Sequence, residues 1–255
     1  MEANRRLMLM IDGDNAQAAL LPQMLAEVSK HGVMKIRRVY GDWGSPLLQP
    51  WKDLLHTYAL KPVQQFSYTS GKNATDIALI IDAMDFINTA EVDGICIISS
   101  DSDYTPLATR IREKSLFVMG IGRKQTPRAF VDACDVFVYT ENLQLVTDGD
   151  RESGIPTPGK ITASPGKASV EDATSRRRLK KLFRTAFDST VQDDGWAHLG
   201  ALGNSLRKLD PGFDPRTYGH KMLSQLVQAN LDFFKIQKRE NKNGNADIYV
   251  QLKKN

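Results

Sequence analysis

Short apolar runs alternate with longer stretches of helical periodicity over the first 147 residues, and this alternation restricts the fold more than any other feature of the chain. Residues 7–11 and 94–98 contain hardly any polar side chain. A strand of this kind is buried on both faces, as happens in parallel sheets that helices cover on each side. The sequence therefore predicts an α/β domain with a mostly parallel sheet and helices on both faces.

The same patterns place the individual elements. We expect strands at residues 7–11, 34–40, 61–68, 94–99, 117–121 and 136–139. We expect helices at residues 16–31, 46–58, 74–88, 104–114 and 127–134. The last of these helices is expected to take Thr126 as its N-cap, because a hydroxyl there can accept a hydrogen bond from the first helical turn.

Composition excludes several protein classes. The chain has 255 residues, of which 41% are hydrophobic and 25% charged, as in ordinary globular proteins. Its apolar runs are far shorter than the roughly 20 residues that cross a bilayer, and the run at 7–11 is too brief for a signal peptide. The two cysteines and four histidines show no metal-ligand or disulfide pattern. We therefore expect a cytoplasmic protein that does not enter the membrane.

The middle of the chain divides it into two modules. Residues 148–173 mix Gly, Pro, Ser and Lys with few bulky apolar side chains, which predicts a flexible linker between domains at 1–147 and 174–255. Residues 1–147 hold 15 basic and 17 acidic side chains, whereas 148–255 hold 19 basic and 13 acidic ones. A basic second module suits a polyanionic partner, although unevenly distributed solvated charge would give the same counts.

Carboxylates follow two of the predicted strands. Asp12 and Asp14 come after the first strand, Asp101 and Asp103 come after the strand at 94–99, and Asp76 lies in the first turn of a predicted helix. Ligands of parallel sheets gather outside the carboxyl ends of the strands. Close carboxylates repel each other by about 4 kcal/mol per pair at about 4 Å, with an effective dielectric near 20, so a cation should offset them. Oxygen ligands alone favour Mg²⁺ or Mn²⁺.

A divalent ion held by carboxylates is typical of phosphodiester hydrolysis, in which the metal activates water and stabilises developing charge. Lys72, Lys124 and Arg128 are candidates to hold the phosphates of the substrate at the same edge of the sheet. The structural alternative is that Asp residues at strand ends only form turns and helix caps. The combination of acids after two separate strands and at one helix start favours the functional interpretation.

Three ordered segments of the first module resemble the signatures of NYN domains, closest to their LabA-like bacterial branch. These segments are residues 9–15, residues 72–79 with Asp82, and residues 98–104. The resemblance implies a fold similar to PIN-domain nucleases and a metal-dependent ribonuclease site. It further implies that Asp12, Asp76 and Asp101 are the principal metal-binding acids, that Asp103 is an additional one, and that Asn15 is a polar positioning residue.

The second module reads as three helices followed by a hairpin. We expect helices at residues 176–189, 200–209 and 214–229, a short strand-like entry at 195–199, and strands at 233–237 and 248–252. This order of elements predicts a winged helix. The basic cluster Arg176, Arg177 and Arg178 opens the first helix and is a candidate nucleic-acid contact, although many charge runs are only solvated.

Residues 212–219, with Leu223, Leu226, Phe233 and Phe234, resemble the LOTUS, or OST-HTH, domain. The resemblance implies binding of RNA or of a protein partner. The hypothesis that combines both modules is a metal-dependent ribonuclease with a C-terminal RNA-binding domain. Two alternatives stay open. The first is an RNA-binding or scaffold protein that keeps an acidic metal site without turnover. The second is a phosphatase of the haloacid dehalogenase type, because Asp12-Gly13-Asp14 resembles the nucleophile-and-acid pair of those enzymes.

Overall fold

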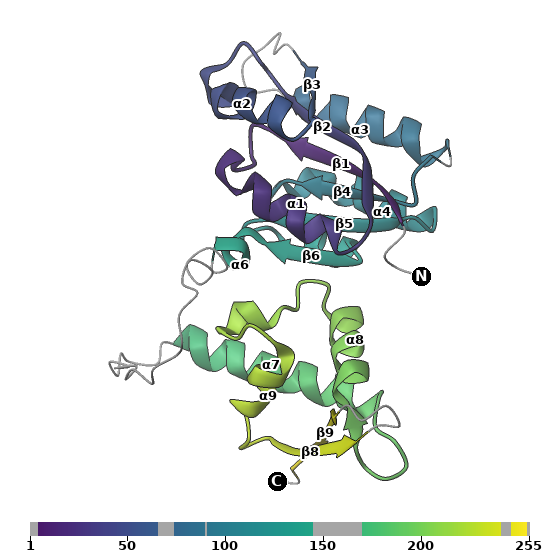
Figure 1. Ribbon diagram of the computed structural model, residues 1–255, viewed down its shortest axis with the longest axis vertical. Helices are drawn as coiled ribbons and strands as arrows, with labels where there is room; N and C mark the ends of the chain where they lie inside the picture. The colour runs from purple at the N-terminus through teal and green to yellow at the C-terminus, as the bar shows by residue number, and fades with distance from the viewer. Residues whose placement is uncertain (1–4, 66–73, 90, 145–169, 241–245, 254–255) are drawn as a thin grey trace. The chain divides into compact units, whose positions relative to one another are not determined.

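The computed structural model describes residues 5–65, 74–89, 91–144, 170–240 and 246–253 (Figure 1). Contacts divide the chain into two compact units, residues 1–146 and 147–255, each of which is described by itself. The predicted linker lies outside the described residues up to position 169, and so do Lys72 and the end of the strand expected at 61–68. No helix in the described ranges is long and apolar enough to cross a bilayer.

The first unit is built on a six-stranded sheet in which every described strand pair is parallel. The strand order is β3-β2-β1-β4-β5-β6. This confirms the α/β fold with a largely parallel sheet that the sequence predicts. The strands are β1 (Arg6–Asp12), β2 (Val33–Gly41), β3 (Lys61–Gln64), β4 (Gly94–Ile98), β5 (Phe117–Gly122) and β6 (Val136–Tyr139).

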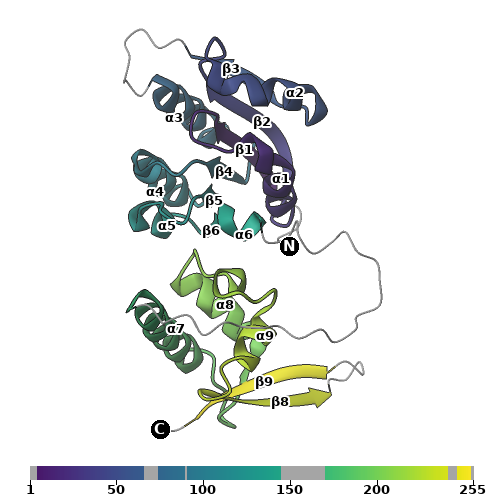
Figure 2. The same cartoon turned by 90° about the vertical axis from the view of Figure 1, so that its left-hand side faces the viewer.

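Helices cover both faces of the sheet (Figure 2). On one face lie α1 (Leu21–Ser29), α2 (Gln49–Thr57) and α6 (Thr140–Gln144), and on the other lie α3 (Ala74–Ile87), α4 (Thr105–Glu113) and α5 (Arg128–Ala133). Strand β1 shows why both layers are needed. Its side chains alternate between the two cores, and all of those from residue 7 to residue 11 are fully buried.

Strands β1 and β4 are neighbours, but the chain leaves them in opposite directions. After β1 it continues to β2 and β3, whereas after β4 it continues to β5 and β6. Such a reversal opens a crevice outside the carboxyl ends of the two strands, where ligands of open α/β sheets bind. The residues that follow β1 and β4 therefore lie beside each other at the place expected for a site.

Helices α1, α2 and α4 begin later than predicted. Each is preceded by a 3₁₀ turn (Ala18–Leu20, Pro46–Leu48 and Ser102–Tyr104) and carries a proline in its first turn. Proline has no N–H and is tolerated only at the start of an α-helix, so Pro22, Pro50 and Pro106 determine where α1, α2 and α4 begin.

The N-cap predicted for α5 is wrong. Pro127 precedes this helix, and no side chain caps it. The backbone N–H of Thr126 closes a turn onto the carbonyl oxygen of Arg123 at 2.9 Å, and the Thr126 side chain is buried. Thr126 thus closes the turn that precedes α5, and Pro127 takes the N-cap position.

The second unit has a small antiparallel sheet, in the order β7-β9-β8, packed against helices, as a winged helix requires. Phe183 lies at its core, with ring centroids 6.1 Å from Phe213 and 5.0 Å from Phe234. The elements are α7 (Val170–Asp188), β7 (Ala197–His198), α8 (Leu199–Leu209), α9 (Leu223–Gln228), β8 (Phe234–Glu240) and β9 (Ala246–Leu252).

Two helices of this unit differ from the prediction. Helix α7 begins at Val170, inside the segment expected to be linker. The helix expected at 214–229 is split into a 3₁₀ turn (Pro215–Tyr218) and α9. Gly219 follows the turn with φ of 78°, a left-handed conformation that ends a helix and that glycine adopts without strain.

Candidate active site

Asp12 is the last residue of β1, and its side chain is fully buried. Its Oδ2 atom accepts hydrogen bonds from Asn15 Nδ2 at 2.7 Å and from Ser99 Oγ at 2.9 Å. Burial raises the pKa of Asp12, the bonds from Asn15 and Ser99 lower it, and the carboxylates of Asp76 and Asp14 raise it again. The net direction is upward, because burial and the neighbouring carboxylates outweigh the two hydrogen bonds.

Asp76 lies in the first turn of α3 and is half-buried. Its Oδ1 accepts a hydrogen bond of 2.5 Å from the hydroxyl of Tyr104, which is also 3.5 Å from Asp12 Oδ2. Burial raises the pKa of Asp76, the Tyr104 bond lowers it, and the charges of Asp101, Asp103 and Asp14 raise it. Burial raises the pKa of Tyr104, and so do the charge of Asp12 and the hydrogen bond to Asp76, so the phenol keeps its proton.

Asp101 and Asp103 follow β4 in the turn that leads into α4. The side chain of Asp101 accepts a hydrogen bond of 2.9 Å from the backbone N–H of Asp103 and thereby caps the 3₁₀ turn. The backbone N–H of Asp101 donates to Ser99 Oγ at 3.1 Å, and the same hydroxyl donates to Asp12. Ser99 thus links the ends of β1 and β4.

Asp14 belongs to the same group of acids, although the sequence only suggested it. Its Oδ2 accepts a hydrogen bond of 3.1 Å from Thr75 Oγ1, which connects the end of β1 to the start of α3. The short spacing Asp12-Gly13-Asp14 placed two acids at one strand end, but the family resemblance assigned no role to Asp14. Tyr104 and Ser99 carried no comparable signal.

The structure therefore brings five acids to the carboxyl ends of β1 and β4, and we call this group the acid cluster: Asp12, Asp14, Asp76, Asp101 and Asp103. Its oxygen donors are those that Mg²⁺ and Mn²⁺ prefer. Within the described ranges, no three His, Cys, Asp or Glu side chains are grouped closely enough to coordinate one ion together. Ion binding would therefore require some of these carboxylates to turn toward one another.

The predicted phosphate-binding residues have different surroundings. Lys124 is exposed in the turn after β5, where its backbone N–H donates to both carboxylate oxygens of Glu141 at 2.9 Å. Arg128 forms an ion pair of 2.8 Å with Asp132 on its own helix, so its charge is paired with a carboxylate outside the acid cluster. Lys72 lies outside the described residues.

The arginines of the basic cluster lie on α7 in the second unit. Arg176, Arg177 and Arg178 are all exposed, and Arg178 is 3.6 Å from a carboxylate oxygen of Asp210. The apolar side of the same helix, which includes Phe183, faces the core of that unit. The arrangement leaves three adjacent guanidinium groups accessible to a polyanion.

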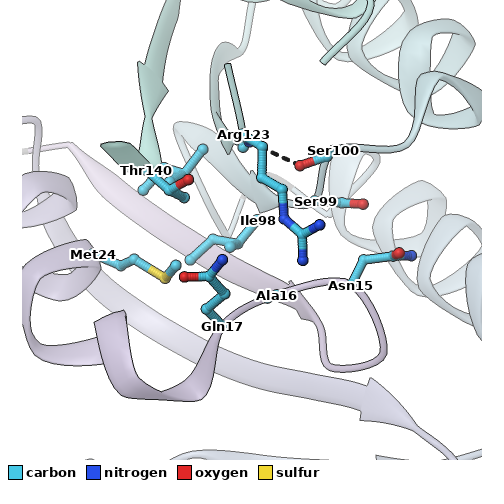
Figure 3. Close-up of a pocket in the computed structure, with 11 residues that line it drawn as sticks. Asn15, Ala16, Gln17, Met24, Ile98, Ser99, Ser100, Arg123 and Thr140 are labelled. Atoms are coloured by element: carbon cyan, nitrogen blue, oxygen red, sulfur yellow. Dashed lines mark hydrogen bonds between the residues drawn. The ribbon is translucent and has the colours of Figure 1, made fainter. Parts of the chain in front are cut away.

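A basic residue that the prediction omitted lies beside two residues that donate hydrogen bonds to Asp12. Arg123 follows β5, and its side chain extends over a small pocket beside Ser99 and Asn15 (Figure 3). Three cations occur together at positions 123, 124 and 128, and nothing in the sequence distinguishes which of them points toward the site.

Comparison with known proteins gives two family matches. Residues 6–143 match the model of the NYN domain, and residues 173–246 match that of the OST-HTH/LOTUS domain. No curated protein is significantly similar to the chain.

Three solved structures are similar to parts of the chain. A protein of unknown function from Vibrio parahaemolyticus is 15% identical, with a TM-score of 0.46, over 55% of this chain and 94% of its own. An uncharacterized protein from Nitrosomonas europaea is 33% identical, with a TM-score of 0.30, over 42% of this chain and 93% of its own. A fragment of a Chromobacterium violaceum protein is 40% identical, with a TM-score of 0.25, over 29% and 78% respectively.

Proposed function

Because the chain belongs to the NYN domain family and carries an OST-HTH/LOTUS domain after the NYN domain, we propose that it is a metal-dependent ribonuclease whose C-terminal domain binds RNA. The observation that carries the proposal is the acid cluster at the ends of β1 and β4. Hydrogen bonds from Ser99 and Asn15 hold the carboxylate of Asp12, and one from Tyr104 holds that of Asp76. This is the position where open α/β sheets bind their ligands.

The chemistry of the donors fits a hard divalent ion. Asp12, Asp76 and Asp101 would hold it, with Asp103 as an additional ligand, and Asp14 is the further acid within reach. Mg²⁺ or Mn²⁺ bound there would supply an activated water and would offset the negative charge that develops on the scissile phosphate. Burial and, to a smaller extent, repulsion from the other acids raise the pKa of Asp12 and Asp76, and such an ion would offset the negative charge held there.

The residues of the chain divide the remaining work. Asn15 and Ser99 hold Asp12 with one orientation of its carboxylate, and Tyr104, as a protonated donor, holds Asp76. Supporting hydrogen bonds of this kind orient metal ligands, and when donated to a carboxylate they also favour its ionised form. The exposed arginines of α7 would hold RNA through its phosphates, without reading its sequence.

The experiment that tests the proposal is cleavage of end-labelled RNA by the purified full-length chain. Single-stranded and structured RNA are incubated with Mg²⁺, Mn²⁺ or EDTA, and binding of the same RNAs is measured in parallel. We expect cleavage that requires a divalent ion. Tight binding without cleavage of any RNA in either metal would contradict the nuclease proposal and favour the alternative of an RNA-binding protein with an inactive acidic site.

A further inference from the structure

A small pocket opens beside the acid cluster at the carboxyl ends of β4 and β5 (Figure 3). Its apolar floor includes Met24 and Ile98. The lining also includes polar residues, namely Asn15, Gln17, Ser99, Ser100, Arg123 and Thr140. Asn15 and Ser99 also donate hydrogen bonds to Asp12, so two residues of the pocket lining contact the acid cluster.

The guanidinium group of Arg123 is available for a ligand. The residue is exposed, and its side chain extends over the pocket toward Ser99 and Asn15 (Figure 3). Among the residues that the structure describes, this guanidinium forms neither an ion pair nor a hydrogen bond, whereas Arg128 is paired with Asp132. Arg123 is thus an unpaired cation at the edge of a group of five acids.

The backbone of Arg123 is held in place. Its N–H donates to Ser100 Oγ at 2.8 Å, and its carbonyl oxygen accepts from the N–H of Thr126 at 2.9 Å. The preceding Gly122 packs so closely that a Cβ atom there would lie 2.6 Å from the carbonyl oxygen of Ser99. The start of this side chain is therefore positioned by the same loop that carries Asp101, which reduces the entropy lost when the guanidinium binds a ligand.

Electrostatics indicates the kind of ligand. An RNA strand that approaches five carboxylates is repelled even when a divalent ion is bound among them, so a nearby cation is needed to hold a phosphate. The guanidinium fork matches two oxygens of a phosphate group. We propose that Arg123 binds a phosphate group of RNA at the mouth of this pocket and so positions the strand over the acid cluster, an inference that rests on the proposed function.

The test measures RNA binding by full-length chains that all carry Asp101→Asn to prevent cleavage. Affinity for two single-stranded RNAs of unrelated sequence is measured over a range of salt concentrations for this parent, for Arg123→Ala and for Arg123→Lys. Lys114→Ala is the matched control, because Lys114 is an exposed cation at the end of α4, just before β5 begins and so at the amino ends of the strands. Thermal unfolding of each variant verifies that it is folded.

We expect Arg123→Ala to weaken binding of both RNAs several-fold and to reduce the slope of log affinity against log salt by about 0.7, the value for one phosphate contact on a single strand. Arg123→Lys should restore the slope and only part of the affinity, because lysine keeps the charge but not the fork. Lys114→Ala should match the parent.

Three results would overturn the inference. A parent that binds RNA while Arg123→Ala keeps its affinity and slope would exclude the phosphate contact and leave the proposed function intact. A loss confined to one of the two sequences would indicate contact with a base instead of a phosphate. If no chain binds RNA, including the Asp101→Asn parent, the proposed RNA function fails and this inference fails with it.

Discussion

The hydroxyl of Tyr104 donates a hydrogen bond of 2.5 Å to Oδ1 of Asp76. The two residues come from different elements, the 3₁₀ turn that precedes α4 and the first turn of α3. Because Tyr104 is fully buried, its ring has little freedom to move with the Asp76 carboxylate. The bond therefore holds Asp76 at a set position beside Asp12.

Tyr104→Phe removes this bond and keeps the ring. We expect cleavage to require a higher Mn²⁺ concentration and to slow by about 10-fold to 100-fold, the usual effect of losing a supporting bond to a metal ligand. The free energy of unfolding should fall by only about 1 kcal/mol. Cleavage measured over a series of Mn²⁺ concentrations checks this, and an unchanged metal dependence would contradict the role assigned to Tyr104.

Asp76→Asn should make the protein more stable while it removes activity. The amide oxygen can still accept the Tyr104 bond, and the repulsion from Asp101, Asp103 and Asp14 disappears. We expect a gain of about 1 kcal/mol in the free energy of unfolding without added metal. Asp53→Asn, at an exposed position in the middle of α2, is the control. Equal stability of the two variants in denaturant melts would argue against charge repulsion at the site.

Acid should weaken the junction between β1 and β4. Arg6 donates through its side chain and its backbone N–H to Asp93, and these bonds lower the pKa of Asp93 to about 2. A lowered pKa in the folded state stabilises the protein above the unfolded value near 3.8, and this contribution is lost as the pH falls toward 2. Wild type should therefore exceed Asp93→Asn in thermal stability at pH 6, and the difference should shrink between pH 4 and pH 2. A constant difference would contradict this.

The exposed arginines of α7 should dominate the salt dependence of RNA binding by the second unit. Replacing Arg176, Arg177 and Arg178 with glutamine removes up to three phosphate contacts, which should reduce the slope of log affinity against log salt by about 2. Folding should be unaffected, because these side chains point away from the core that contains Phe183. A slope equal to that of wild type would place the RNA-binding surface elsewhere.

The sheet and the approximate position of the acids could be predicted because they depend on local patterns. Residues 7–11 of β1 and all of β4 are apolar. This alone implies burial on both faces and places Asp12 and Asp101 at or just after strand ends. The residues at which the helices begin were harder to predict from the sequence. The prolines that define them were visible in the sequence, but apolar periodicity extended each predicted helix past them.

The supporting residues could not be predicted because they depend on contacts between distant parts of the chain. Thr75 meets Asp14 only once α3 has packed on the sheet, and Tyr104 meets Asp76 only because a 3₁₀ turn precedes α4. The backbone N–H of Arg123 donates to the side chain of Ser100, which lies in the loop after β4, and this bond distinguishes Arg123 from Lys124. Such pairings leave no periodic trace in a single sequence.

The most direct measurement is RNA cleavage by purified wild type, Asp101→Asn and the control Asp53→Asn, prepared and assayed side by side in Mn²⁺ and in EDTA. The asparagine at position 101 can still accept the capping hydrogen bond from Asp103, so the fold around it should persist. We predict metal-dependent cleavage by wild type and the control, and none by Asp101→Asn despite retained RNA binding. Equal cleavage by all three proteins would contradict the assignment of the acid cluster as the active site.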